Sequence, residues 1–73
     1  MKNVIDKLEI SLNGKRIASD AQTLHALLLA QGFETKAAMA CAINKRFVPR
    51  AEWPSRALQH GDQIDVVTPI TGG

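Results

Sequence analysis

Alternation of apolar and polar residues predicts two strands near the start of the chain. Residues 8–12 (LEISL) alternate at every position, which is the pattern of a half-buried strand. Asn13-Gly14 follows, and this dipeptide is a strong hairpin indicator because both residues tolerate a positive φ. Residues 15–18 are then expected to return as the second strand.

A helical period replaces the strand period after residue 20. Three leucines at i, i+3 and i+4 form an apolar stripe on one helical face: Leu24, Leu27 and Leu28. Gln31 occupies position i+7 of the same face. Asp20 and Thr23 are both candidate N-caps, since a short side-chain oxygen accepts a bond from an unpaired first-turn N–H. Gly32, just past the stripe, predicts the end of the helix.

The next part of the chain predicts two strands joined by a tight turn. Residues 33–37 form a connector, and the uniformly apolar run 38–43 is interpreted as a strand with both faces largely covered. Asn44-Lys45 turns the chain into a short strand at 46–48, which Pro49 ends because proline cannot donate to a sheet ladder.

The last part predicts an irregular segment and a final strand. Residues 50–58 have no clear period, and Trp53 is their expected core anchor. A turn at 59–62 leads into the strand 63–67, where apolar and polar residues alternate again. The order strand, strand, helix and three strands predicts an α+β fold, with one helix packed on one face of a mixed sheet of about five strands.

Length and composition narrow the class of protein. A chain of 73 residues allows one domain with a thin core, and 45% hydrophobic with 22% charged residues is typical of globular proteins. The net charge of +2 is spread along the chain, and only three residues are aromatic, which argues against nucleic-acid binding. The start of the chain has no signal-peptide core, and the longest apolar run, 37–43, is too short to span a membrane. We therefore expect a cytoplasmic protein.

Residues that carry chemistry are sparse. Neither glycine-rich phosphate-binding motif occurs, and His25 and His60 with the single Cys41 match no zinc spacing. Cys41 lies in an apolar strand, so it is interpreted as an inert buried thiol, and one thiol forms no internal disulfide. Glu52 and Asp62 are interpreted as surface charges. We expect no metal site and no enzyme.

The segment 68–73 (TPITGG) stands out against this background. It is uncharged apart from its terminal carboxylate, and the lack of Cβ atoms in Gly72-Gly73 makes a stem thin enough for a narrow channel. A carboxylate becomes reactive when its oxygen attacks a nucleotide α-phosphate and forms an acyl-adenylate. Pro69 restricts Thr68 to extended conformations, which directs a flexible tail away from the sheet.

The chain resembles the ThiS family, the sulfur carrier proteins of thiamine biosynthesis, which have the ubiquitin-like β-grasp fold. Five stretches carry the resemblance: LNGK (12–15), TLHALL (23–28), AINKRFVPRAEW (42–53), HGDQIDVV (60–67) and the final Gly72-Gly73. They span roughly residues 8–73, so the chain is expected to be one β-grasp domain with residues 1–7 as a short extension.

The resemblance implies a route for sulfur through Gly73. A ThiF-type adenylyltransferase uses ATP and Mg²⁺ to adenylate the Gly73 carboxylate. Sulfur from a cysteine desulfurase, or from another donor, then displaces AMP and leaves a thiocarboxylate, from which thiazole synthase takes the sulfur. The protein itself binds no cofactor and has no catalytic residues. Gly72, Thr71 and Ile70 are expected to thread into the partner.

Docking must then come from the folded body, because threading a flexible tail costs entropy. Outward-facing Val67, with Phe47 and Arg50, is the candidate docking surface. In the alternative, Val67 packs under the tail, Phe47 belongs to the core, and Arg50 joins Arg46 and Arg56 in a solvated charged face.

Three other functions stay open at this point. The first is a sulfur carrier for another pathway, such as molybdopterin synthesis. The second is a β-grasp interaction module whose terminus has no chemical role. The third is a modifier that is joined to the lysines of other proteins. The identity of the acceptor enzyme tests the first alternative, and the effect of truncating the terminus tests the second. Higher-mass conjugates on a denaturing gel test the third.

Overall fold

A tight hairpin opens the part of the chain that the structure, a computed structural model, describes: residues 7–69. Its strands, β1 (Leu8–Leu12) and β2 (Lys15–Ser19), pair antiparallel. Asn13 and Gly14 join them with φ values of 52° and 83°. Two positive φ angles match the right-handed twist of the strands, so the predicted hairpin is confirmed.

The helix α1 (Leu24–Ala30) begins at Thr23. The Oγ1 of Thr23 accepts a hydrogen bond from the backbone N–H of Ala26 at 3.1 Å, so Thr23 is the N-cap and Asp20 is not. The helix ends at the predicted place, because Gly32 there adopts a φ of +85°.

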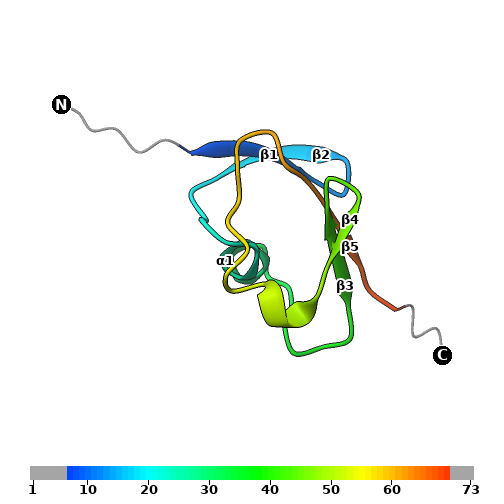
Figure 1. The fold of residues 1–73 in the computed structure, drawn as a ribbon. Helices are drawn as coiled ribbons and strands as arrows, with labels where there is room; N and C mark the ends of the chain where they lie inside the picture. Colours follow the sequence, from blue (N-terminus) through cyan, green and yellow to red (C-terminus); the bar gives the residue numbers. More distant parts are fainter. Residues whose placement is uncertain (1–6, 70–73) are drawn as a thin grey trace.

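Three further strands complete one sheet with the order β2-β1-β5-β3-β4. They are β3 (Ala40–Ile43), β4 (Arg46–Val48) and β5 (Gln63–Val67), and a 3-10 turn η1 (Arg50–Glu52) follows β4. The central strand β5 runs parallel to β1 and antiparallel to β3. Figure 1 shows the mixed sheet curving around α1, as the predicted α+β architecture requires.

The core lies between α1 and the inner face of the sheet. The three leucines of the predicted stripe are fully buried, which contributes about 1.5–3 kcal/mol for each side chain. Strand residues pack against them: Ile10, Ile43 and Ile64. Trp53 is the predicted anchor, since it is buried and its Nε1–H donates to the carbonyl of Val48 at 3.0 Å.

Only one face of β3 is covered, so the prediction of a strand covered on both faces is wrong. Cys41 and Ile43 face the core, whereas Ala40 is exposed and Ala42 is half-buried. The strand is also shorter than the predicted 38–43. Uniformly apolar composition hid this alternation, because alanine lies at a surface at little cost.

Asp62 is buried, with 5% of its surface exposed, so its interpretation as a surface charge is also wrong. Its carboxylate accepts hydrogen bonds from Asn44 Nδ2 at 3.1 Å and from the backbone N–H of Gln59 at 2.9 Å. Asn44 Oδ1 accepts in turn from the N–H of Gln63 at 2.9 Å. A buried carboxylate needs such partners, and this network ties the β3–β4 turn to the start of β5. Glu52 is exposed, as predicted.

The two predicted terminal segments lie largely outside the described residues. Of the extension 1–7 the structure describes Lys7, and of the tail 68–73 it describes Thr68 and Pro69. Within residues 7–69, no helix is both long enough and apolar enough to cross a membrane.

Candidate functional site

The tail leaves the fold from the middle of the sheet. β5 is the central strand in the spatial order of the sheet and ends at Val67. Thr68 and Pro69 follow it as exposed residues. Ala40 lies opposite Val67 across the β3–β5 pair, so β3 starts beside the point where β5 ends. Four predicted site residues lie outside the described part of the chain: Ile70, Thr71, Gly72 and Gly73.

An apolar surface lies on the outer face of the sheet beside this point. We call it the outer patch and define it as Ala40, Ala42, Phe47 and Val67. Phe47 is 69% exposed and Val67 is 65% exposed. Ala42 lies opposite Phe47, and Ala40 lies opposite Val67. Because paired residues point to the same face, the two large side chains flank the two alanines.

The exposure of Phe47 and Val67 tests the alternative in which Phe47 belongs to the core and Val67 packs under the tail. Phe47 is solvent-facing, so its placement in the core is wrong, and most of the Val67 side chain is also free of the described residues. The strand alternation explains both, because the next residues, Val48 and Val66, take the inward positions. Large apolar side chains exposed on one face are a feature of protein-interaction sites.

Ala40 and Ala42 belong to the outer patch although sequence reasoning did not select them. Asp65 shares their face and lies opposite Ala42, so a carboxylate forms part of the margin of the patch. An apolar centre with a polar rim is the usual composition of a protein interface. The period-2 alternation within 40–43 is the pattern that identifies the two alanines once the inward positions are known.

Arg50, the third predicted docking residue, makes contacts within the chain. Its guanidinium donates to the backbone carbonyls of Thr35 and Ala37, the second at 2.6 Å. Its Cζ also lies 4.5 Å from the centroid of the Trp53 ring, which is a cation–π contact. The other two candidate arginines differ from each other: Arg46 is exposed on β4, while the half-buried Arg56 donates to the carbonyl of Ala57.

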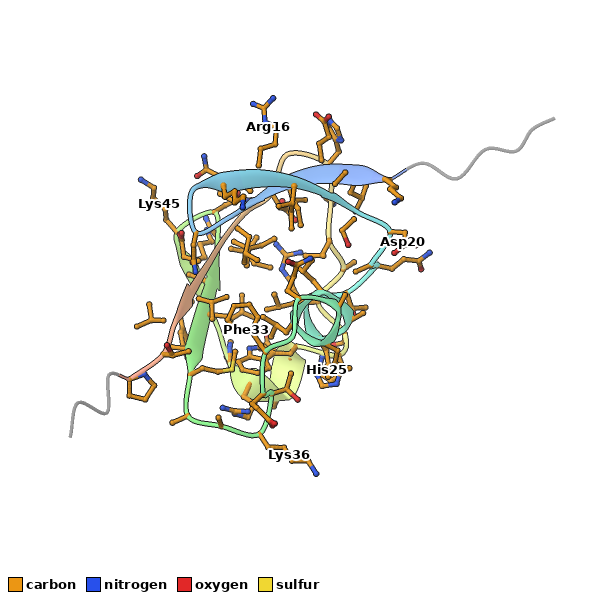
Figure 2. The ribbon with its side chains drawn as sticks, turned by 180° about the vertical axis from the view of Figure 1, so that it is seen from behind. Arg16, Asp20, His25, Phe33, Lys36 and Lys45 are labelled. Atoms are coloured by element: carbon orange, nitrogen blue, oxygen red, sulfur yellow. The ribbon has the colours of Figure 1, made fainter. Side chains whose placement is uncertain are left out.

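Two hollows flank the connector, which in the structure comprises residues 31–39, between α1 and β3. The smaller lies at the root of the tail, with Phe33, Met39, Thr68 and Pro69 in its wall. The larger lies on the Trp53 side and includes His25, Lys36 and Arg50. Ala37 and Ala38 line both hollows. In Figure 2, Phe33 points inward between α1 and the sheet, whereas Lys36 points away from the molecule.

The predicted burial of Cys41 is confirmed, since 2% of its surface is exposed. Burial raises the pKa of the Cys41 thiol, and the positive charge of Arg50 offsets only part of that rise. A thiol with a raised pKa is a poor nucleophile at neutral pH. Among residues 7–69, no group of three or more His, Cys, Asp and Glu side chains is placed to hold a metal ion.

The geometry of the described residues therefore supports binding. The central strand β5 ends at the exposed Val67, Thr68 and Pro69 follow it, the outer patch lies beside this point, and a hollow opens at Thr68 and Pro69. An exposed apolar surface with a polar margin is the kind of surface that a protein partner binds.

Comparison with known proteins gives one family and one fold. The ThiS family model matches residues 5–73. The chain is 44% identical over 52 residues to the sulfur carrier protein ThiS of Escherichia coli (strain K12), and the match covers 71% of this chain and 77% of that protein.

Two solved structures of a thiamine biosynthesis protein (ThiS) from Geobacter metallireducens share the architecture. The crystal structure matches with a TM-score of 0.74 and 18% identity, covering 90% of this chain and all of that one. The NMR solution structure matches with a TM-score of 0.75 and 19% identity, covering 90% and 88%. Within residues 7–69, the five-stranded mixed sheet with α1 packed on one face is thus that of the predicted ubiquitin-like β-grasp.

Proposed function

This chain belongs to the ThiS family, and from that premise we propose how it carries sulfur. The protein is a small sulfur carrier of thiamine biosynthesis and works with partner enzymes. Its cargo is held at the C-terminal Gly73, which lies in the stretch matched by the family. The folded body serves to dock the tail on each partner in turn.

Two steps load the sulfur. A carboxylate oxygen of Gly73 attacks the α-phosphate of ATP, the bond to pyrophosphate breaks, and an acyl-adenylate remains. Mg²⁺ in the partner neutralises the phosphate charge. Sulfur at the oxidation level of sulfide then attacks the acyl carbon, the bond to AMP breaks, and loss of a proton leaves a thiocarboxylate.

The partners supply the catalytic groups for this sequence. We assign adenylation to a ThiF-type adenylyltransferase, sulfur supply to a cysteine desulfurase or another donor, and sulfur acceptance to thiazole synthase. A desulfurase delivers its sulfur as a protein persulfide, so a thiol must reduce the S–S bond and end in a disulfide to leave sulfur at the oxidation level of sulfide. In the transfer, sulfur bonds to the acceptor, its bond to the acyl carbon breaks, and an oxygen of water or of the acceptor attacks the acyl carbon. The Gly73 carboxylate is thereby restored, so the carrier is a recycled co-substrate and not an enzyme.

One observation carries the proposal: β5 ends at the exposed Val67, on the same face as the exposed Phe47, directly before the tail. Burying these two side chains against a partner contributes about 1.5–3 kcal/mol each. Ordering four tail residues costs about 1–2 kcal/mol per residue. The two terms are similar in size, so docking through the outer patch offsets a large part of the cost of threading the tail.

The test is the chemical state of Gly73 after loading. The protein is incubated with ATP, Mg²⁺, sulfide and the adenylating enzyme of the same organism, and its C-terminal peptide is sequenced by mass spectrometry. A thiocarboxylate adds about 16 Da, the same as oxidation of a methionine, so the shift must be localised to Gly73. Deletion of Gly73 is the matched control and should abolish the shift.

Substitution of Gly72 by alanine tests the slender stem. Gly72→Ala should sharply lower the yield of thiocarboxylate without changing the melting temperature, since a Cβ widens the tail inside the partner. A plain carboxylate on the wild-type Gly73 after full incubation contradicts the proposal. A thiocarboxylate that thiazole synthase does not accept assigns the carrier to another sulfur pathway.

A further inference from the structure

The segment that follows β4 is joined to two other parts of the fold through Trp53. The indole Nε1–H donates to the carbonyl of Val48 at 3.0 Å, and the backbone carbonyl of Trp53 accepts from the N–H of His25 at 3.1 Å. Trp53 is 2% exposed, so its ring is held by the core. It is therefore a fixed platform between β4 and the start of α1.

Arg50 uses this platform to reach across to the connector. Its guanidinium stacks over the Trp53 ring with Cζ at 4.5 Å from the centroid. The Nη1 and Nη2 groups donate to two different carbonyls, those of Thr35 and Ala37, which lie 15 and 13 residues earlier in the chain. Two donors in one rigid plane fix both the position and the orientation of that backbone.

Phe33 and Met39 anchor the connector to the core near its two ends, and the stretch between them has few other contacts that hold it in place. Residues 31–39 contain no strand or helix in the described structure, and their one local backbone bond beyond the helix end runs from the N–H of Ala37 to the carbonyl of Glu34. Few backbone bonds and exposed residues are the features of a segment with low local stability. The Arg50 contacts are therefore a large share of what orders residues 34–38, between these two anchors.

The position of the connector links Arg50 to the tail. The connector leads into Ala40, which lies opposite Val67. Ala37, Ala38 and Met39 line the hollow whose remaining wall includes Thr68 and Pro69. The backbone that Arg50 holds is thus the wall beside which the tail leaves β5.

We propose that Arg50 is a positioning residue for the modification of Gly73: by holding the carbonyls of Thr35 and Ala37, it fixes the wall of the hollow at the root of the tail. This role rests on the proposed function. With the wall fixed, the tail leaves the sheet over a narrow range of directions. With the wall mobile, a smaller fraction of docked complexes has Gly73 at the nucleotide.

The role has a kinetic signature. Docking through the outer patch sets the KM for the carrier, whereas the fraction of docked complexes with a correctly placed carboxylate sets kcat. Misplacement of a reacting group lowers the rate of the chemical step. Loss of the Arg50 contacts should therefore lower kcat and leave KM nearly unchanged.

The rival role for Arg50 is the one expected from the sequence, a direct charge contact with the partner. Lysine distinguishes the two. Lysine keeps the positive charge that would attract an acidic partner, but it lacks the planar fork that holds two carbonyls. Arg50→Lys should therefore resemble the neutral Arg50→Gln if Arg50 positions the connector, and resemble the wild type if its charge contacts the partner.

The experiment compares Arg50→Lys and Arg50→Gln with Arg46→Lys and Arg46→Gln, which change an exposed arginine on β4. NMR hydrogen exchange of the free protein is followed at Ala37, whose N–H bonds to the carbonyl of Glu34, and adenylation is followed by pyrophosphate release. Both Arg50 variants should exchange faster at this amide and lose about 3- to 10-fold in kcat, with KM within about twofold of the wild type. Both Arg46 variants should match the wild type in exchange and in kcat.

Three results overturn the proposal. The first result is an Arg50→Lys variant with the hydrogen exchange and kcat of the wild type, together with an Arg50→Gln variant whose KM rises in a salt-dependent way. This result identifies a direct contact between the Arg50 charge and the partner. Faster exchange throughout the β-sheet together with a lower melting temperature identifies a general role in stability. Absence of adenylation in the wild type refutes the proposed function and the positioning role with it, whereas a loss confined to the Arg50 variants supports both.

Discussion

Ala40 of β3 lies opposite Val67 of β5, at the end of the sheet from which the tail departs. The pairing brings the end of the connector, one edge of the outer patch and the root of the tail to one place. In the proposed function, a partner that receives Gly73 meets all three surfaces along one short stretch of the sheet, and substitutions there should separate docking from folding.

Val67→Asp should weaken docking and leave the fold intact. A carboxylate at the centre of a buried contact loses its hydration without gaining a partner, so the KM for adenylation should rise by about tenfold or more, which corresponds to about 1.4 kcal/mol. The melting temperature should not change, because Val67 is 65% exposed.

Gln63→Asp is the matched control for Val67→Asp. It places the same charge on the same face of β5, at the opposite end of the strand from the tail, and should leave KM unchanged. Equal effects of the two variants on KM refute docking at the outer patch. A collapsed melting curve in Val67→Asp assigns Val67 to the core instead.

Asp62→Ala should lower the free energy of unfolding by about 1–3 kcal/mol. The substitution removes the acceptor of two part-buried hydrogen bonds, those of the Asn44 amide and the Gln59 N–H. Urea denaturation measures the change. Asp65→Ala, which removes an exposed carboxylate from the same region, should stay within about 0.5 kcal/mol of the wild type. Similar small losses in both variants contradict the structural role of Asp62.

Thr23→Ala should destabilise the protein by about 1 kcal/mol, because the N–H of Ala26 loses its side-chain acceptor. Asp20→Ala should have an effect below about 0.5 kcal/mol, and Thr23→Ser should keep most of the wild-type stability, since serine retains the capping oxygen. Thermal unfolding of the three variants measures these differences. A larger loss in Asp20→Ala than in Thr23→Ala contradicts the observed cap.

Cys41 should make the protein less stable at alkaline pH. The folded state favours the protonated thiol, because burial raises its pKa, whereas the thiol of the unfolded chain ionises at its ordinary pKa. The contribution is therefore fully present below the unfolded pKa and is lost as the pH rises toward the folded value.

Urea midpoints measured from neutral pH to about pH 10 check this dependence on Cys41. Cys41→Ala should be less stable than the wild type at neutral pH, because it leaves a cavity, but its stability should fall less steeply with rising pH. An identical slope in the two proteins contradicts the assignment. The folded wild type should also react far more slowly with a thiol reagent than the unfolded chain does.

Several elements could be predicted from the sequence because their causes are local. The positive φ angles of the β1–β2 turn need Asn13 and Gly14, which are neighbours in the chain. The leucines of α1 are brought to one face by the helical period, and Gly32 ends the helix by its own backbone freedom. The family stretches, with Gly72-Gly73, pointed to the sulfur carrier role.

Other features could not be predicted because their causes are distant in the sequence. Asp62 reads as a surface charge until the fold places Asn44 beside it, 18 residues away. Arg50 reads as a free cation until the connector presents two carbonyls to it. The sheet register decides which alanines of β3 face outward and join Phe47 and Val67.

The sequence by itself determined the type and order of the elements, because periodicity and turn residues act over a few positions. It also determined which residues make up the segment 68–73. Only the tertiary structure decided which polar groups are buried, where Arg50 binds and which surface lies beside Val67, Thr68 and Pro69. Burial and hydrogen bonding depend on which segments meet in space, and that is set by the packing of the whole sheet around α1.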